Sequence, residues 1–258
     1  MISSKIPAQL MSQCKKCHSI YLTYRLGKYK ICPICGAYQR IESDMYMSLI
    51  FDDFKILSKE SKLSNPLNIN SYEKKWIEAK KLGQTESVEI GTAHIGGKIV
   101  DVGIFNPSFM MGSIGKICGD RIVYLFEHAT RQKLPVVMIV SSGGARMQEG
   151  IVSLMQLQRI SNAIFKHSSS GLLYVSLLCD PCMGGATASL GMQADIILGE
   201  KGATIGFAGK RVIQNTIHEN IDNELQKSES LVQNGFIDCV VNREDEKYII
   251  NKILDLHQ

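Results

Sequence analysis

Residues 135–166 read PVVMIVSSGGARMQEGIVSLMQLQRISNAIFK, and the rest of the chain is organised around them. PVVMIV is a short apolar run that predicts a fully buried strand, and from Ile151 apolar residues recur at helical spacing. Between strand and helix, Gly143 and Gly144 have no Cβ, so a ligand can approach their N–H groups closely. The helix start that follows adds unpaired donors and a partial positive charge. The turn therefore suits a developing anion, although a tight connection without a ligand explains the same residues equally well.

The composition is that of an ordinary globular protein with one large core and a small appendage. The chain has 258 residues, 45% hydrophobic and 21% charged, with a formal net charge of +4. It contains no run of about 18 apolar residues, so we expect no membrane span. Its first dozen residues are not typical of a secretory signal or a transit peptide. We therefore expect the protein to stay in the compartment where it is made.

Four of the eight cysteines form two C-x-x-C pairs, at Cys14, Cys17, Cys32 and Cys35. Each pair presents two thiolates on one side of a turn, and two such turns close a tetrahedron around one Zn²⁺. A closed shell of four sulfurs leaves no position for substrate water, so the metal is expected to be structural and to fold a segment without a core of its own. A disulfide pair or an iron centre is the alternative, and His18 is an alternative ligand. The other cysteines lie in apolar surroundings, as in a reducing compartment.

The chain divides into four expected segments: an N-terminal tail (1–13), a zinc ribbon (14–40), a helical connector (41–85) and a main body (86–258). In the connector, apolar residues from Ile41 onward recur at helical spacing, and a second helix is predicted from an N-cap at Ser71 to Gly83. The body opens with VEIGTAHI and KIVDVGIF, and the Gly96-Gly97 dipeptide between them predicts a tight hairpin.

FMMGSIGKICGDRIVYLFEHATRQ, residues 109–132, predicts one long helix. Its glycines Gly112, Gly115 and Gly119 would line one face, which could press close to another backbone or to a cofactor. They do not form G-x-G-x-x-G after a strand, so the fingerprint of a dinucleotide-binding fold is absent.

Downstream segments alternate between strands and helices, which predicts parallel pairing and an α/β body. DPCMGGATASLGM places a second glycine turn at a strand-to-helix position equivalent to the first. Together the turns offer backbone donors at Gly143, Gly144, Ala145, Gly184, Gly185 and Ala186.

Few side chains near these turns could act as catalysts. There is no G-x-S-x-G elbow and no assignable triad. Cys182 fits a small buried residue better than a nucleophile, and Glu149 fits a carboxylate that stabilises a helix start better than a general base. N–H donors without an acid or base suit a reaction through an enolate whose proton the other substrate handles.

Several long motifs occur in order behind the four-cysteine ribbon: FMMGSIG, SGGARMQEG, DPCMGGATASLGM, ADIILGE and IGFAGKRVI. In this combination they resemble the β subunit of the acetyl-CoA carboxylase carboxyltransferase of bacteria and plastids. The resemblance runs from Cys14 to about Val241. It implies that the body has a crotonase-type ββα spiral fold of the ClpP/crotonase superfamily.

The resemblance also implies an activity and partners. The carboxyl group would pass from carboxybiotin, on a biotin carboxyl carrier protein, to acetyl-CoA, giving malonyl-CoA for fatty acid biosynthesis. The partner would be an α subunit of the same fold in an α2β2 assembly, with the active site between unlike subunits. A separate biotin carboxylase would be the component that uses ATP. We expect the bacterial cytoplasm, with the plastid stroma as the alternative.

By this resemblance, Gly184 and Gly185 form one oxyanion hole, and Gly143, Gly144 and Ala145 shape the same site. The α subunit would supply the second hole, so this chain alone should be close to inactive. The expected acyl-CoA contacts are Gly112, Gly115, Arg146, Ala186, Phe207 and Gly209. Arg121, Arg131, Lys210 and Arg211 fit solvated surface better than contacts to CoA phosphates.

Three positions depart from the family pattern. Met111 stands where the family usually has the second glycine of FMGGS, Lys116 replaces a small residue, and Cys182-Met183 replaces a Thr pair. The first two departures bear on how closely the Gly112 helix approaches CoA, and the third leaves open some breadth in acyl-CoA choice. The alternative within the fold is a decarboxylase or a carboxylase of another acyl-CoA. A hypothesis from another class is a nucleic-acid binder, supported by the basic residues of the ribbon, Lys15, Lys16, Arg25, Lys28 and Lys30.

Overall fold

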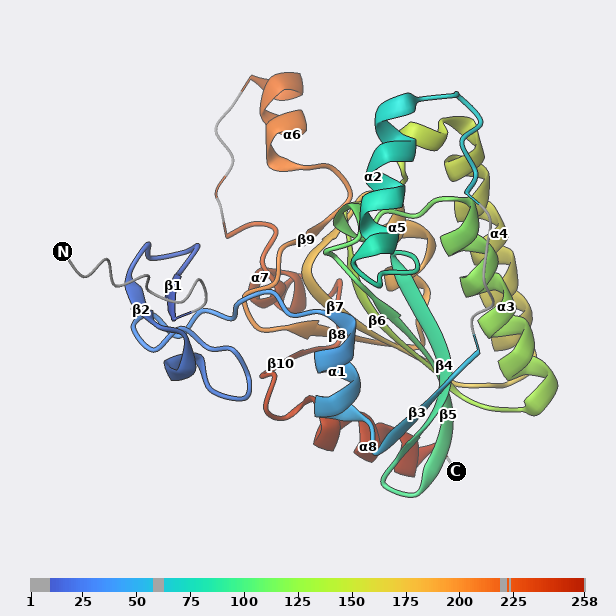
Figure 1. The fold of residues 1–258 in the computed structure, drawn as a ribbon. Helices are drawn as coiled ribbons and strands as arrows, with labels where there is room; N and C mark the ends of the chain where they lie inside the picture. Colours follow the sequence, from blue (N-terminus) through green and yellow to red (C-terminus); the bar gives the residue numbers. More distant parts are fainter. Residues whose placement is uncertain (1–9, 58–62, 219–221, 223, 258) are drawn as a thin grey trace. The chain divides into compact units, whose positions relative to one another are not determined.

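The computed structural model describes residues 10–57, 63–218, 222 and 224–257 (Figure 1). The chain divides into two compact units, Met1–Ile41 and Glu42–Gln258. Residues 1–9 of the expected tail and 58–62 of the expected connector lie outside the described residues.

The first unit is a small ribbon. Strand β1 (Met11–Gln13) pairs antiparallel with β2 (Ile20–Leu22), and a 3-10 turn, η1 (Thr23–Leu26), follows. Met11–Gln13 is therefore part of the ribbon rather than of an N-terminal tail, because β2 takes up its backbone hydrogen bonds. Among the described residues of this unit, four buried side chains form its core cluster: Cys14, Tyr21, Leu26 and Cys32.

The second unit is built on one sheet with the order β10-β8-β7-β6-β5-β4-β3, and β9 pairs with β7. The strands are β3 (Asp53–Ile56), β4 (Val88–Ile95), β5 (Lys98–Phe105), β6 (Val136–Ser142), β7 (Tyr174–Met183), β8 (Ile196–Glu200), β9 (Ile205–Gly206) and β10 (Cys239–Val241). Pairing is parallel from β5 through β10, as the alternation of strands and helices predicts. All residues of the central strand β6 are buried, which explains its continuous apolar sequence.

The antiparallel edge contains the predicted hairpin and one strand that was not predicted. β4 and β5 pair along their whole length, and the two glycines between them have positive φ, +56° at Gly96 and +82° at Gly97. This confirms the tight turn. Strand β3 adds to the outer side of β4, and helix α1 (Ser43–Ile50) contacts β3, β5 and α8 (Glu246–Leu256). The first half of the expected connector is therefore packed onto the body.

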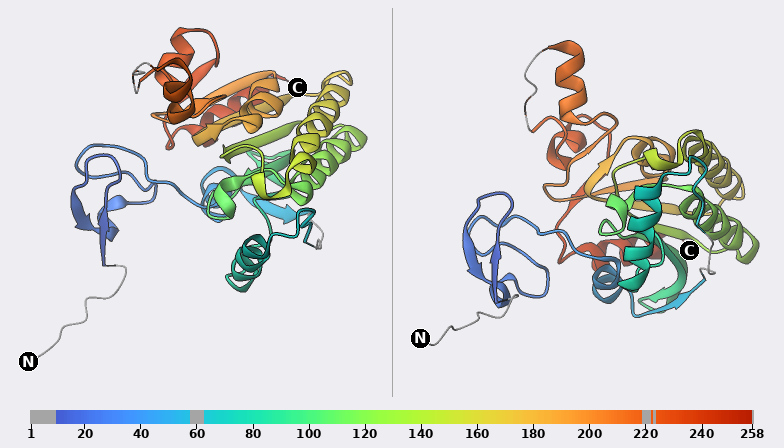
Figure 2. Two further views of the ribbon diagram at one scale, coloured as in Figure 1. Left: turned by 90° about the horizontal axis from the view of Figure 1, so that it is seen from above. Right: turned by 45° about the horizontal axis from the view of Figure 1, so that its top comes forward.

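The remaining helices are α2 (Asn70–Lys81), α3 (Lys116–Gln132), α4 (Ile151–Ser168), α5 (Gly185–Ser189), α6 (Lys210–Ile217) and α7 (Ser228–Gln233). Helices α3 and α4 lie side by side, and α3 also packs on β4 and β5 (Figure 2). Their apolar faces and the sheet enclose the main core, which includes Ile122, Phe126 and Ile160. Among the described residues, no helix combines the length and the apolar character that crossing a membrane requires.

Two helix starts differ from the prediction. Helix α2 begins at Asn70, so Ser71 lies inside it, and the Asn65 side chain accepts the Ile69 N–H at 3.0 Å instead. Helix α3 begins only at Lys116, because the preceding residues form a 3-10 turn, η2 (Met110–Gly112), with non-helical backbone at Met111.

The glycines predicted to line one helical face consequently do not share one. Gly112 has φ +66° within the turn, Gly115 is the N-cap of α3, and only Gly119 lies inside the helix. A Cβ on each would collide with this chain's own atoms: the Ser141 carbonyl, the Glu149 carboxylate and the Gln156 side chain, respectively. These glycines therefore permit close packing within the body.

Candidate functional site

The two glycine turns meet at one edge of the sheet. Strands β6 and β7 pair in parallel, with Ser142 opposite Cys182, so the turns that follow them emerge together. A Cβ on Gly144 would lie 3.1 Å from the Met183 carbonyl oxygen and 3.3 Å from the Gly185 nitrogen. Gly144 also has φ +99°, a conformation that side chains disfavour. The absence of a side chain there lets one turn rest on the other, backbone against backbone.

Three of the amides expected to be open donors are already bonded. The Gly143 N–H donates to the Met111 carbonyl at 2.9 Å, and the Gly144 N–H donates to Ser142 Oγ at 3.1 Å. In the second turn, the Gly184 N–H donates to the Gly206 carbonyl at 2.9 Å. The prediction that these N–H groups are free for a ligand is therefore wrong, because the neighbouring chain segments satisfy them.

Two of the three open donors lie at the start of α5. The N–H groups of Gly185 and Ala186 meet no acceptor within the residues that the structure describes, and neither does that of Ala145. Gly185 and Ala186 are the first two residues of α5, where N–H groups have no intrahelical acceptor. The partial positive charge of a helix start favours an anion at this position.

Arg146 lies behind the first turn and is fully buried. Its guanidinium forms an ion pair with Glu86 and also donates to the Ser113 carbonyl at 2.8 Å and to the Tyr72 hydroxyl at 3.2 Å. Burial alone would lower the pKa of Arg146, but the charge of Glu86 outweighs it and holds the pKa above its ordinary value. The expected acyl-CoA contact of Arg146 is therefore corrected: its protein partners occupy the guanidinium, which anchors the turn from within.

Glu149 belongs to the same buried network. Its carboxylate accepts the Tyr72 hydroxyl at 2.6 Å and the Lys116 N–H at 2.6 Å, and it lies 3.3 Å from Arg146 Nη1. Because Lys116 is the first residue of α3, Glu149 stabilises the start of that helix. The interpretation as a helix-stabilising carboxylate holds, although the helix is α3 and not the adjacent α4.

Cys182 is inaccessible, as the sequence interpretation favoured. Its side chain is fully buried, and burial raises the pKa of its thiol to about 12, against the opposing effect of a hydrogen bond to Thr187. A thiol in that state is not an effective nucleophile at neutral pH.

The other expected substrate contacts divide into two cases. Gly112 and Gly115 are pressed against Ser141 and Glu149, which corrects their assignment to an open CoA surface. Phe207 is 72% exposed, and a Cβ on Gly209 would meet open space, so both positions are accessible. Met111 was not among the expected contacts, although it departs from the FMGGS pattern of the family. Its side chain is 64% exposed and lies beside Gly143.

The basic residues considered for phosphate contacts differ in their exposure to solvent. Arg121 is buried and donates to the Val88 carbonyl at 2.8 Å and to Thr85 Oγ1 at 3.1 Å, so it is not solvated surface. Arg131 is exposed and lies over the Tyr124 ring. The side chains of Lys210 and Arg211 lie outside the described residues.

A cavity of about 530 Å³ lies away from the glycine turns. Its lining includes Lys98, Pro135 and Leu173, which begin or precede β5, β6 and β7. It therefore opens at the amino ends of these strands, whereas the glycine turns follow their carboxyl ends.

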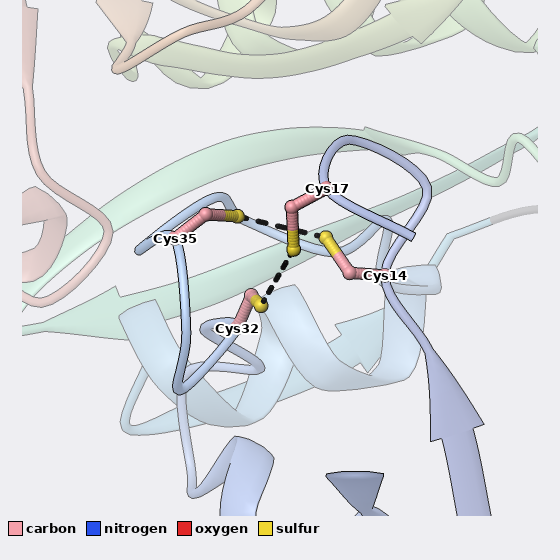
Figure 3. A group of neighbouring side chains, drawn as sticks. All are labelled: Cys14, Cys17, Cys32 and Cys35. Atoms are coloured by element: carbon pink, nitrogen blue, oxygen red, sulfur yellow. Dashed lines mark hydrogen bonds between the residues drawn. The ribbon is translucent and has the colours of Figure 1, made fainter. Parts of the chain in front are cut away.

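The ribbon brings the four expected metal ligands together (Figure 3). Their sulfur atoms all lie within 4.8 Å of one another, with 3.7 Å between Cys14 and Cys35 and 3.8 Å between Cys17 and Cys32. A tetrahedron with Zn–S bonds of about 2.3 Å has edges of about 3.8 Å, so both distances fit a four-sulfur metal shell. They are far too long for a disulfide. The Lys16 N–H and the Gln39 side chain donate to the Cys14 sulfur, which stabilises negative charge on it.

Known proteins resemble this chain in sequence over nearly its whole length. The family described as Carboxyl transferase domain matches residues 65–256. The acetyl-coenzyme A carboxylase carboxyl transferase subunit beta of Ligilactobacillus salivarius (strain UCC118) is 43% identical over 254 residues, which cover 98% of this chain and 90% of that protein. The subunit beta 2 of Lachnospira eligens is 43% identical over 247 residues, covering 95% of this chain and 96% of that protein.

Solved structures share the fold. Transcarboxylase 12S with hydrolysed methylmalonyl-coenzyme A superimposes with a TM-score of 0.71 at 25% identity, covering 83% of this chain and 41% of that chain. A Pseudomonas malonate decarboxylase hetero-tetramer in complex with malonate gives a TM-score of 0.68 at 21% identity, covering 84% of this chain and 82% of that chain, and shows the fold alone. The expected crotonase-like α/β fold is thereby confirmed, and the chain belongs to the carboxyl transferase family, among the β subunits of acetyl-CoA carboxylase carboxyl transferases.

Proposed function

We propose that this chain is one half of a carboxyltransferase that moves the carboxyl group of carboxybiotin, carried on a biotin carboxyl carrier protein, to acetyl-CoA. The product would be malonyl-CoA for fatty acid biosynthesis. The names of relatives that match nearly the whole chain at 43% identity support this reaction. ATP would be used only by a separate biotin carboxylase, and the bacterial relatives favour the cytoplasm.

The observation that carries the proposal is the pair of unbonded amides at Gly185 and Ala186, beside the first glycine turn. Removing the methyl proton of acetyl-CoA places negative charge on the thioester oxygen, and amides aimed at that oxygen stabilise the transition state. Losing one such donor typically costs about 2.7–4 kcal/mol. When bound, carboxybiotin supplies the carboxyl group and then a base for that proton. Gly143, Gly144 and Gly184 would shape the site without donating.

An exposed apolar surface favours a protein partner next to this site. Met147, Ile151, Leu154 and Met155 recur at helical spacing along η3 (Met147–Glu149) and α4, and each is more than half exposed. Leu157, on the same helix, abuts the Gly185 position. We infer that the α subunit covers this surface in an α2β2 assembly and supplies the second oxyanion hole. The chain alone should therefore be close to inactive.

We further propose that the ribbon holds one structural Zn²⁺ through Cys14, Cys17, Cys32 and Cys35. The sulfur spacing supports a tetrahedral ion, and the four-residue core of this unit is too small to fold it without additional stabilisation. Zinc in a closed four-sulfur shell supplies folding energy and takes no part in the transfer.

The reverse reaction tests the proposed activity. The full chain and the α subunit are mixed with malonyl-CoA and free biotin, and acetyl-CoA formation is measured with each component omitted in turn. We expect turnover only when both subunits and biotin are present. A mixture that turns over methylmalonyl-CoA but not malonyl-CoA would contradict the assignment and favour a carboxylase of another acyl group.

A second function, nucleic-acid binding, is favoured by the surface of the ribbon. Lys15, Lys16, Arg25 and Lys28 are exposed, and so is the Tyr24 ring. Cations with an exposed aromatic ring suit phosphates and a stacked base. Binding of a single-stranded RNA oligonucleotide should weaken steeply with salt, survive replacement of Gly185 and disappear when zinc is removed. Binding that does not respond to zinc removal would exclude the ribbon as its site.

A further inference from the structure

Residues 110–112 form a run of left-handed backbone beside the first glycine turn. The φ angles are +47° at Met110, +59° at Met111 and +66° at Gly112. Glycine adopts such angles freely, whereas an unbranched side chain such as methionine is rarely found there because its Cβ crowds the following carbonyl oxygen. Outliers of this kind persist only where the surroundings impose them, and they concentrate at functional sites.

The surroundings that impose this conformation are visible. Phe109 is fully buried just before the run, and the Gly112 carbonyl accepts the Ser142 hydroxyl at 2.6 Å. The Met111 carbonyl accepts the Gly143 N–H at 2.9 Å. The segment is therefore clamped by its backbone onto the first glycine turn.

None of these contacts needs the side chain of Met111. A glycine at this position would present the same carbonyl to Gly143 without the crowding. The methionine side chain is 64% exposed, so it contributes little to the core. It nevertheless lies over the turn: its Cβ and Cε are 3.7 and 3.9 Å from the position of a Cβ on Gly143.

Building on the proposed function, we propose that the Met111 side chain sets acyl-chain specificity by narrowing the space above Gly143 where the acyl group of the CoA thioester lies. Gly143 precedes Gly144, where a Cβ would lie 3.3 Å from the Gly185 nitrogen proposed to hold the thioester oxygen, so Met111 borders the space next to that oxygen. A methionine is apolar and adaptable, which suits closing a small pocket around a methyl group.

The test compares Met111→Gly and Met111→Ala with the unaltered chain, each assembled with the α subunit. Carboxybiotin is regenerated on the carrier protein by biotin carboxylase, ATP and bicarbonate. With this carboxyl donor, the kcat/KM values for carboxylation of acetyl-CoA and propionyl-CoA are measured, and the melting temperature of each variant is recorded. The expected result is that the preference for acetyl-CoA over propionyl-CoA falls by about tenfold, the lower range for discrimination of one methylene. The melting temperature should stay the same or rise, because glycine relieves the crowding.

Lys133→Gly is the matched control. Lys133 also has positive φ, +56°, but it ends α3 and borders the cavity at the amino ends of the strands. Its replacement should affect the melting temperature similarly and leave the acyl preference unchanged.

The outcomes separate this inference from the function on which it rests. An equal change for both thioesters, or a large drop in melting temperature for Met111→Gly, would overturn the specificity role while leaving the carboxyltransferase assignment intact. An unaltered complex that carboxylates neither thioester would overturn the proposed function, and the inference with it.

Discussion

Replacing Arg146 by methionine should destabilise the second unit strongly, because it leaves two buried carboxylates without their cation. The side chains of Arg146, Glu86 and Glu149 are all fully shielded from water. Removing one partner of a buried ion pair costs about 3–5 kcal/mol. Methionine retains much of the apolar stem and removes the guanidinium, whose central carbon lies over the Phe109 ring, so the loss should reflect charge more than a cavity.

The loss can be measured by urea unfolding followed through the fluorescence of Trp76, the only tryptophan in the chain. Trp76 lies on α2, the helix that also carries Tyr72, a partner of Arg146. In the double variant with Glu86→Gln, one unpaired carboxylate is gone, so the combined loss should be smaller than the sum of the single losses by about 0.5–3 kcal/mol.

Arg159→Met is the control, because Arg159 pairs with Asp120 at the surface, where both side chains are partly exposed. An exposed pair contributes at most about 1 kcal/mol. If Arg146→Met lowers the free energy of unfolding by no more than Arg159→Met does, or if the effects of the Arg146 and Glu86 changes add independently, the buried ion pair does not stabilise this unit.

Three further predictions follow from other parts of the chain. Purified protein should contain one zinc ion per chain by elemental analysis, and Cys14→Ser should lose it, whereas Cys239→Ser, outside the cluster, should keep it; equal zinc in both would contradict the ribbon site. Cys182→Ala should retain carboxyltransferase activity within a few fold, and iodoacetamide should not label Cys182 at pH 7, since burial raises the pKa of its thiol to about 12. Burial and the charge of Glu200 raise the pKa of the Glu246 carboxyl well above its ordinary value. The protonated carboxyl therefore favours the folded state, and this contribution to stability declines as the pH rises above about 4.5 toward the folded-state pKa. Glu246→Gln should therefore flatten the loss of melting temperature between pH 5 and 8, and an unchanged slope would contradict this.

The sequence predicts those features that depend on local pattern. Three structures are determined within a few residues of sequence. The spacing of the cysteine pairs predicts the sulfur cluster, Gly96-Gly97 predicts the hairpin turn, and the apolar run predicts the buried strand β6. The parallel order follows from the alternation of strands and helices, and the two glycine turns meet because neighbouring parallel strands end at the same edge.

The sequence does not predict which distant groups accept hydrogen bonds from the amides of the glycine turns. The acceptors of the Gly143 and Gly184 amides, Met111 and Gly206, come from other segments that only the tertiary fold brings close. Arg146 was expected to contact acyl-CoA, because its main counterion Glu86 lies 60 positions away and the sequence gives no sign of their pairing. The helical pattern before Lys116 likewise gives no sign that Gly112 packs against the Ser141 carbonyl, with which a Cβ would collide.

The most direct test of the central claim removes a single N–H group without changing a side chain. Incorporating glycolic acid at position 185 replaces the amide of Gly185 by an ester, and the same replacement at Gly143 removes an N–H that already bonds to Met111. With the α subunit present, we expect kcat for carboxyl transfer to fall by about 10²–10³-fold for the ester at position 185 and by far less for the ester at position 143. Equal effects at the two positions, or no effect at position 185, would contradict the assignment of the α5 amide as the oxyanion donor.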